Sequence, residues 1–396
     1  MPLTMSEKRS VTNEMRDEYR KANKKRKGQM LDELCKLADY NRSYAARKLR
    51  SQKTTRSNKK LKKPLQKTRG RKRKYGPECL DPLITVWTVL DLACGKRMAA
   101  AMEDTVDALI RFDELDCAPD VIEKLNTMSA STIDRMLAVQ RKKMCLKGRS
   151  TTKPGTLLKH DIPIRRGTDW DEDKPGFVEM DTVSHCGEST RGQYVVTLDV
   201  TDIKTCWTEQ RACINKAQKH VFAEVKEIRA RLPFELLGID SDGGGEFIND
   251  QMYRYCKTEE LVFTRGRPYK KNDGCHIEQK NWTCVRQAVG YGRFETKEEH
   301  DLLNMIYDYL RLINNFFMPS QKLVTKERDG ARIVRKLDTP KTPYKRVLES
   351  KEIDVKNKNL LKGIYPTLNP AEIRREIIRL VHELYKIKDE REHTQG

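Results

Sequence analysis

The stretch "GIDSDGGGEF" (238–247) combines acidic side chains with three consecutive glycines at the end of an apolar run. Asp240 and Asp242 stand where a short buried strand is expected to end, and Glu246 follows them. Glycines alone suffice for a turn, so the two carboxylates beside the strand end need another explanation. Carboxylate oxygens are ligands of hard divalent cations. One of these acids is therefore a candidate metal ligand, and its partners must come from elsewhere in the chain.

Residues 177–317 contain the elements that would position such a site. Alternating apolar and polar residues predict strands over 177–183, 193–201 and 204–213, joined by short turns as an antiparallel meander. An apolar stripe at helical spacing predicts a helix over 215–232. The predicted order continues with a strand over 234–240, a helix over 247–259, a strand over 261–266, and helices over 276–291 and 297–317.

This order of elements resembles the ribonuclease-H-like fold, an α/β core with a mixed five-stranded sheet flanked by helices. Three motifs resemble those of bacterial insertion-sequence DDE transposases, which have a retroviral-integrase-type catalytic core. "EMDTV" places Asp181 in the first strand, where the family has its first acid. "SDGGGEF" resembles the family's "SDNGxEF" and makes Asp242 the second acid, with Gly243 at the usual Asn position. "NDGCHIEQKNW" resembles the family's loop and helix entry and makes Glu278 the third.

The spacing of the acids supports this resemblance, because 35 residues separate Asp242 from Glu278, as in the family. The resemblance implies that Asp181 bridges two Mg²⁺ or Mn²⁺ ions, while Asp242 holds one ion and Glu278 the other. Two such ions about 3.5–4 Å apart can clamp the attacking and leaving oxygens of a phosphodiester. The implied reactions are hydrolysis at a transposon end and attack of the freed 3′-OH on target DNA. Each acid taken singly is better explained as a surface carboxylate.

Basic residues crowd the loop before Glu278, which makes it a candidate DNA clamp. The candidates are Arg265, Arg267, Lys270 and Lys271. A merely solvated loop is the alternative.

Three further candidates follow Glu278 on the same predicted helix. Lys280 and Arg286 could grip the transposon end. Asn281 shares the helix face of Glu278 three residues on and could hydrogen-bond a phosphate.

Residues 29–50 have the pattern of two short helices separated by the turn "ADYN". Leu31, Leu34 and Cys35 form one apolar face, and Ala45, Ala46 and Leu49 form the other. The opposite face of the second helix carries four basic residues, Arg42, Arg47, Lys48 and Arg50. A helix-turn-helix places such a second helix in the major groove of DNA. A helical hairpin with a solvated basic face is the alternative.

A basic arm follows the first 50 residues. Twelve of the 24 residues from 51 to 74 are Lys or Arg and none is acidic, so no core can form there. The segment "RGRKRK" at its end could track phosphates or enter the minor groove. Its candidate contacts are Arg69, Arg71, Lys72, Arg73 and Lys74. A solvated linker is the alternative.

Residues 77–146 have a second helical pattern, with helices predicted over 81–93, 95–112 and 118–144. The last of these is interrupted by a turn at "MSAS", where Ser129 or Ser131 could cap the helix that carries Arg135. We interpret it as a second helix-turn-helix unit. A loop-like linker follows over 147–176.

The C-terminal region over 321–396 is basic at first and contains no recognisable strand-rich barrel. A helix is predicted over 369–387, with Asn369 as its N-cap and Pro370 at the first position. Ile373, Ile377, Leu380, Leu384 and Ile387 follow a short heptad spacing. This seam is compatible with a contact between subunits or with packing inside one chain.

Composition limits the classes of function. The 396 residues carry a formal net charge of +21, which indicates a polyanionic partner such as nucleic acid. No apolar run is long enough to span a membrane, and no secretory signal is expected. The 11 cysteines form no CxxC pair, which favours reduced thiols in a cytoplasmic, nucleoid-associated protein.

The sequence therefore predicts a DNA transposase with double-stranded DNA as partner and a homo-oligomeric active form. The predicted domains are 1–50, an arm over 51–76, 77–146, a linker over 147–176, a catalytic core over 177–320 and the tail over 321–396. Two alternatives remain open: a DNA-binding repressor with a decayed core, and a ribonuclease-H-like nuclease that never joins strands.

Overall fold

The computed structural model describes residues 3–51, 74–143, 174–266, 277–329 and 332–395. The chain divides into two compact units, Met1–Arg71 and Lys72–Gly396. Each unit has a hydrophobic core of its own. The residues predicted as a separate second domain, 77–146, pack within the larger unit, because their buried side chains share one core with the sheet and the C-terminal helix.

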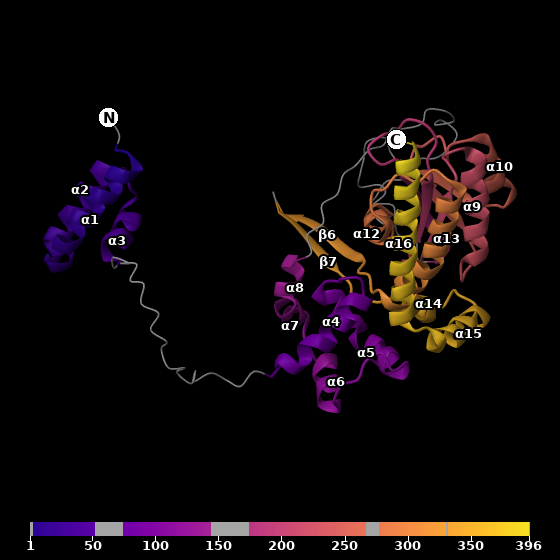
Figure 1. Cartoon of the computed structure of the whole chain (residues 1–396), viewed down its shortest axis with the longest axis horizontal. Helices are drawn as coiled ribbons and strands as arrows, with labels where there is room; N and C mark the ends of the chain where they lie inside the picture. The colour runs from indigo at the N-terminus through magenta and orange to yellow at the C-terminus, as the bar shows by residue number, and fades with distance from the viewer. Residues whose placement is uncertain (1–2, 52–73, 144–173, 267–276, 330–331, 396) are drawn as a thin grey trace. The chain divides into compact units, whose positions relative to one another are not determined.

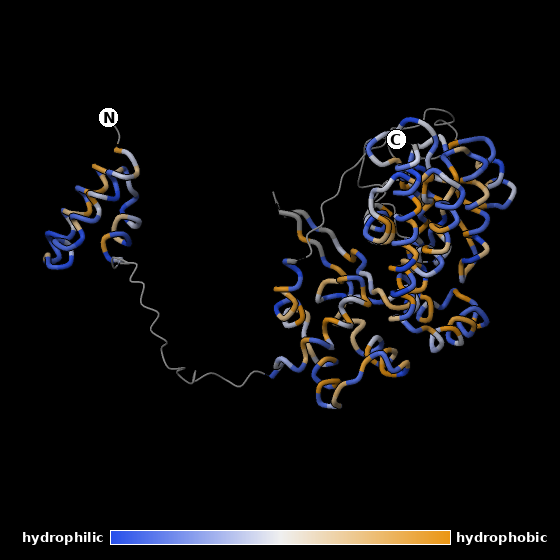
Figure 2. The backbone as a smooth tube through the Cα atoms, viewed as in Figure 1, coloured by the Kyte–Doolittle hydropathy of each residue, from blue (hydrophilic) through white to orange (hydrophobic). Residues whose placement is uncertain are grey.

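The smaller unit contains the helices α1 (Met5–Lys21), α2 (Lys24–Ala38) and α3 (Arg42–Arg50). Figure 2 shows hydrophobic and hydrophilic residues alternating along them, as expected for helices with one buried face. The predicted pair of helices is confirmed, but its first helix begins at residue 24, because Asn23 caps it. Helix α1 was not predicted, since only Thr12, Arg16 and Tyr19 of its 17 residues are buried.

The larger unit begins with short helices. They are η1 (Pro77–Cys79), α4 (Leu80–Val89), α5 (Gly95–Arg111), α6 (Pro119–Asn126), α7 (Ala130–Met136) and α8 (Ala138–Lys143). Ser129 caps α7 by accepting from the backbone N–H of Thr132, as predicted for this position. The helix predicted to run to residue 144 is broken at Leu137, which is fully buried between α7 and α8.

A mixed five-stranded sheet forms the centre of this unit, as predicted. Its strands are β1 (Phe177–Ser184), β2 (Val196–Asp202), β3 (Thr208–Cys213), β4 (Gly238–Ser241) and β5 (Val262–Arg265). They lie in the order β3-β2-β1-β4-β5. Strands β1, β2 and β3 pair antiparallel, which confirms the predicted meander, while β4 is parallel to both β1 and β5.

Helices cover both faces of the sheet (Figure 1). One face packs on α9 (Gln218–Arg231) and α10 (Asp250–Thr258) through Val178, Met180 and their neighbours. The other packs on α11 (Ile277–Lys280) and α13 (Lys297–Leu312), and its core includes Val183. Since alternate residues of a strand face opposite sides, Asp181 shares the face of Val183.

The two predicted helices after β5 are both modified by π-helical turns. Helix α11 continues as η2 (Asn281–Arg286) and then α12 (Gln287–Val289). Helix α13 ends in a second π-helical turn, η3 (Ile313–Phe317). Turns of this kind occur mostly as single insertions in α-helices and often lie at functional sites.

The C-terminal region contains a hairpin that was not predicted, β6 (Leu323–Asp329) with β7 (Arg332–Leu337). Helices α14 (Pro343–Glu349), α15 (Val355–Ile364), η4 (Tyr365–Thr367) and α16 (Pro370–Gln395) follow.

The terminal helix α16 packs inside the chain. Its predicted N-cap is confirmed, because Asn369 Oδ1 accepts from the backbone N–H groups of Ala371 and Glu372. The seam residues Ile373, Ile377, Leu380 and Leu384 are buried in the same core as α13. The heptad spacing is thereby explained by packing within one chain.

Candidate active site

Strand pairing brings Asp181 and Asp242 together. Strands β1 and β4 are parallel neighbours in which Met180 stands opposite Ser241. Asp181 follows Met180 and Asp242 follows Ser241, so the two acids stand next to each other. The carboxyl ends of parallel neighbours meet at the same edge of a sheet, which is the usual position for ligand sites in sheets with helices on both faces.

Asp181 is held by two donors. The backbone N–H of Thr182 donates to Oδ1 over 2.7 Å, and the side-chain amide of Asn281 donates to Oδ2 over 2.6 Å. Desolvation and, after it, the negative charge of Asp242 nevertheless raise the pKa of Asp181 to about 7. The two hydrogen bonds act in the opposite direction because they stabilise the ionised form.

Asp242 lies in the loop that follows β4. The backbone N–H of Gly244 donates to its Oδ1 over 2.9 Å. Burial raises the pKa of Asp242 and the charge of Glu246 adds to this, while Lys216 lowers it. A Cβ at Gly244 would lie 2.8 Å from Asp242 Oδ1 and 2.6 Å from Glu246 Oε2. Glycine is therefore needed at 244 for the two carboxylates to occupy these positions.

Gly243 is under no such constraint. A Cβ there would meet nothing within 4 Å. Position 243 therefore has room for the Cβ atom of another residue.

Glu246 has a role that the sequence did not reveal. A helix was predicted to begin directly after it, at residue 247, but α10 begins at Asp250, because Asn249 is the N-cap and accepts from Met252 N–H. Glu246 instead lies in the loop, where Oε1 accepts from Thr182 Oγ1 over 2.9 Å and pairs with Lys216 Nζ at 3.2 Å. It thus links the residue after Asp181 to the loop of Asp242.

The backbone of Glu278 lies in α11, and its side chain is outside the described residues. The residue before it, Ile277, donates its N–H to Glu179 Oε2 over 2.7 Å. Asn281, three residues after it, donates to Asp181. Both contacts are to β1, so the helical turn that carries Glu278 is fixed over the strand that carries Asp181.

The residues fit divalent cations by their chemistry. The half-buried carboxylate of Asp181 and the exposed one of Asp242 repel each other here, and bound Mg²⁺ or Mn²⁺ would relieve that repulsion with the oxygen ligands these ions prefer. Among the described residues, no group of three or more His, Cys, Asp or Glu is arranged to hold a metal ion. This absence does not extend to Glu278, because its side chain lies outside the described residues.

The DNA-contact candidates near the site have protein partners. Arg265 is buried in β5 opposite Ser241. Lys280 is half-buried, with Nζ 3.5 Å from the carbonyl oxygen of Cys206. Arg286 donates to the carbonyl oxygens of Ser184 over 2.7 Å and Gly290 over 3.2 Å. Arg267, Lys270 and Lys271 lie outside the described residues.

The other candidates lie on exposed surfaces where they are described. Arg42 is exposed and pairs with Asp32, and Arg47 and Lys48 each lie 5.3 Å from the centre of the Tyr44 ring. Arg50, Lys74 and Arg135 are also exposed. Arg69, Arg71, Lys72 and Arg73 lie outside the described residues.

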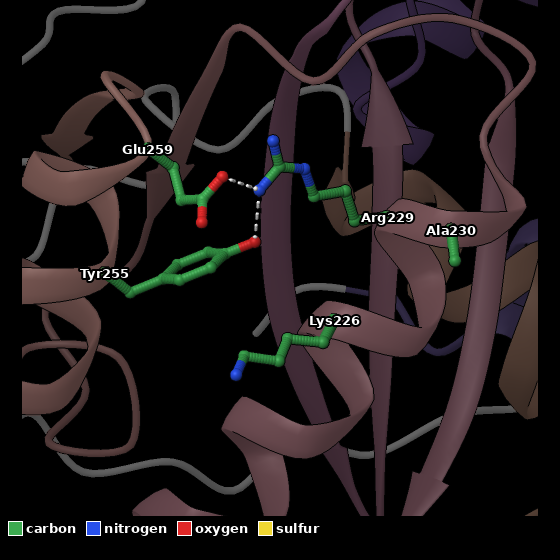
Figure 3. A pocket seen from close by; sticks show the side chains of 5 residues that line it. All are labelled: Lys226, Arg229, Ala230, Tyr255 and Glu259. Carbon is green, nitrogen blue, oxygen red and sulfur yellow. Dashed lines mark hydrogen bonds and ion pairs between the residues drawn. The ribbon is translucent and has the colours of Figure 1, made fainter.

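A separate pocket lies between α9 and α10 (Figure 3). Arg229 donates to Tyr255 OH and to Glu259 Oε2, both over 2.8 Å. Lys226 lies 4.6 Å from the centre of the Phe222 ring. None of the three candidate acids lines this pocket, so it is not the place where they would act.

Comparison with known proteins gives one relative of similar length. A Sinorhizobium fredii protein, "Uncharacterized protein y4rM", is 34% identical over 346 residues, which are 87% of this chain and 96% of that protein. The chain belongs to the family of this protein. No protein-family model matches the sequence.

A solved structure, the catalytic core domain of BIV integrase, is 16% identical, with a TM-score of 0.31. The match covers 44% of this chain and 95% of that one. The strand order and pairing described above, rather than this likeness, define the fold. Within the described residues, no helix is both long enough and apolar enough to cross a membrane.

Proposed function

We propose that the chain is a DNA transposase of the DDE type, which cleaves the ends of a mobile element and joins them to target DNA. The observation that supports it best is the adjacency of Asp181, within β1, and Asp242, just past the end of the parallel strand β4, beside the helix that carries Glu278. This is the arrangement that the motifs "EMDTV" and "SDGGGEF" imply for such an enzyme.

In this proposal Asp181, Asp242 and Glu278 hold two Mg²⁺ or Mn²⁺ ions. When bound, the ions supply charge neutralisation at the scissile phosphate and a more acidic water or 3′-OH. Asn281 orients the Asp181 carboxylate through its amide. Gly244 N–H holds the carboxylate of Asp242, and Glu246 ties the Asp242 loop to Thr182 and Lys216. These contacts hold the acids before DNA arrives.

DNA is the proposed partner because the chain carries a net charge of +21 and a small helical unit whose last helix is basic. We propose that α3 reads the element end and that the arm over 51–74 contacts phosphates. Binding should then weaken steeply as salt rises, since each phosphate contact releases counterions. Titration of labelled end DNA at several salt concentrations measures this, and a flat log–log plot would contradict it. A homo-oligomer that bridges two ends is part of the same proposal.

A nuclease that cuts without joining is the second candidate. The paired carboxylates support it equally, because hydrolysis and strand transfer use the same metal site. A decayed repressor is less well supported, because Asp181 and Asp242 lie on neighbouring strands and each accepts a hydrogen bond that fixes its carboxylate.

The deciding experiment supplies a duplex whose 3′-OH end has already been cut. Purified protein, the labelled duplex and a plasmid target are incubated with Mg²⁺ or Mn²⁺. Joined product supports the transposase. Cleavage of the uncut duplex without joining of the pre-cut one identifies the nuclease. Binding without either reaction identifies the repressor.

A further inference from the structure

Lys216 is the cation of the candidate site whose charge has no role in the function proposed above. It lies in the connection between β3 and α9, a part of the chain in which the sequence indicated no site residue. Its ammonium nitrogen Nζ lies 3.2 Å from Glu246 Oε1 and forms an ion pair with that carboxylate. Within the described part of the chain, no other basic residue forms an ion pair with Asp181, Asp242 or Glu246.

The site has a surplus of negative charge around Lys216. A Cβ at Gly244 would lie close to both the Asp242 and the Glu246 carboxylate, so these two acids border the same point of the loop. A DNA phosphate that approaches them is repelled by like charges. Two divalent ions would do no more than balance these two acids together with Asp181 and Glu278. A positive charge for the phosphate itself must then come from the protein.

The ammonium of Lys216 is accessible to such a phosphate. The Lys216 side chain is 34% exposed, whereas that of Glu246 is 11% exposed. An ammonium has more than one N–H donor, and the contact with Glu246 is its hydrogen bond within the described residues. Glu246 Oε1 also accepts from Thr182 Oγ1 over 2.9 Å. The carboxylate therefore stays held when Lys216 binds a second anion.

The backbone on both sides of Lys216 is anchored. Asn215 Oδ1 accepts from the backbone N–H of Ala217 over 2.9 Å. Gln218 Nε2 donates to the carbonyl oxygen of Gly245 over 3.5 Å, which joins the start of α9 to the glycine-rich loop after β4. The position of Lys216 beside the acids is thus set before DNA binds, which lowers the entropy lost on binding.

The basic residues that the sequence indicated near the site are arranged differently. Lys280 Nζ contacts a backbone carbonyl oxygen, and the hydrogen bonds of Arg286 also end on backbone carbonyl oxygens. These contacts hold the helix of Glu278 against the sheet. Lys216 instead contacts a carboxylate of the site and remains partly exposed to solvent.

We propose that Lys216 contacts a DNA phosphate beside the 3′-OH that is joined, and that Glu246 holds its ammonium in place until DNA binds. This inference rests on the function proposed above, because it assigns Lys216 to the substrate of that reaction. A brace that only holds Glu246 and the Asp242 loop is the alternative. The two roles are separable, because a phosphate contact requires charge on the DNA and a brace acts without DNA.

The test is a double-mutant cycle between the protein and the DNA. Lys216→Met of the full chain is compared with the wild type on the pre-cut duplex. In a set of modified duplexes, an uncharged methylphosphonate replaces one phosphate at a time near the joined 3′ end. Lys216→Met should join unmodified DNA about tenfold more slowly, because a hydrogen bond to a charged group is lost.

One modified duplex should slow the wild type by the same factor and Lys216→Met no further, since both changes remove the same contact. Additive losses at every position would overturn the contact. Lys216→Arg keeps the charge and should join at close to the wild-type rate, whereas slowing equal to that of Lys216→Met would exclude a role of the charge. Lys257→Met, exposed on α10, is the matched lysine control and should join normally.

A second readout follows Mn²⁺ binding by electron paramagnetic resonance in the absence of DNA. Lys216→Met should bind Mn²⁺ at least as tightly as the wild type, because a positive charge beside the ions is removed. Weaker Mn²⁺ binding would identify the brace and overturn the phosphate contact. Failure of the proposed function is distinct: a wild type that joins no DNA removes both, whereas a wild type that joins with additive losses removes only the role of Lys216.

Discussion

The amide of Asn281 donates to Asp181 Oδ2 from the first residue of the π-helical turn that follows α11. This contact joins the helix of Glu278 to the strand of Asp181, residues that are far apart in the sequence. It also places a neutral donor on an acid whose pKa is raised by burial and by Asp242. Asn281 therefore orients the carboxylate of Asp181 and lowers its pKa against the larger effect of desolvation.

Replacement of Asn281 by Ala should raise the pKa of Asp181 further, because the lost hydrogen bond favours the ionised form. A hydrogen bond to a charged group contributes roughly 1.5–3 kcal/mol, so joining at pH 7 should fall about tenfold or more. The loss should shrink at higher pH, where Asp181 ionises in the variant as well. Joining rates measured from pH 6 to pH 9 check this, and an unshifted profile would exclude the proposed role.

The isosteric variants Asp181→Asn, Asp242→Asn and Glu278→Gln should each reduce strand joining by about 10³-fold or more, because each removes a proposed metal ligand. Binding of end DNA should remain, since none of these residues is a proposed anchor for DNA. Joining is measured with a pre-cut end and binding by gel shift. Glu259→Gln, in the pocket between α9 and α10, is the control and should join normally. Full joining activity in any of the three variants would show that the replaced residue is not a metal ligand of the catalytic site.

Two neighbouring glycines allow a matched comparison. In Gly244→Ala the new Cβ would displace the carboxylates of Asp242 and Glu246, whereas in Gly245→Ala it would meet nothing within 4 Å. We expect joining to fall about tenfold or more in the first variant and little in the second, since small displacements in a catalytic site cost large factors in rate. Equal joining activity of the two variants would show that strand joining does not depend on the position of the Asp242 carboxylate.

Stability of the metal-free protein should fall as pH rises from about 4 to about 7. An Asp in the unfolded chain releases its proton near pH 3.9, while Asp181 in the folded protein keeps it until about pH 7. Across this interval the unfolded state binds fewer protons, so the free energy of unfolding decreases with pH. Asp199 contributes in the same direction up to about pH 6.

Thermal unfolding in EDTA at pH 5 and pH 8 measures this effect. The difference in Tm between the two pH values should be smaller in Asp181→Asn than in the wild type by about 2–4 °C. Addition of Mn²⁺ at pH 8 should raise the Tm of the wild type but not that of the variant. An equal pH dependence in the two proteins would contradict the raised pKa of Asp181.

Much of the sheet could be predicted from the sequence because its strands alternate or are wholly apolar. The residues of β2 are all buried and those of β1 nearly so, which produces a strong local signal. The β6–β7 hairpin escaped prediction because half of the residues of "VTKERDGARIVRKL" are charged. Its pairing depends on cross-strand hydrogen bonds rather than on a buried face.

The candidate site was predictable only in part. Asp242 could be found because it follows an apolar strand and opens a glycine-rich loop, and Asp181 because its motif resembles a known one. The contacts of Lys216 and Glu246 could not, because they depend on how the connection before α9 packs against the loop after β4 and on where α10 begins. The DNA roles of the basic residues stay predictions.

Burial of Leu380 and Leu384 against α13 bears on how the protein is synthesised. The unit α1–α3 has its own core and can fold as soon as it leaves the ribosome. The unit with the candidate site lacks part of its core until residue 384 is made. At about 5–20 residues per second, translation of residues 51–384 takes roughly 17–67 s. In chains stalled before α16, we expect protected amides in α1–α3 and exchange-competent ones in the sheet, so that the basic unit could reach DNA before the larger unit is complete.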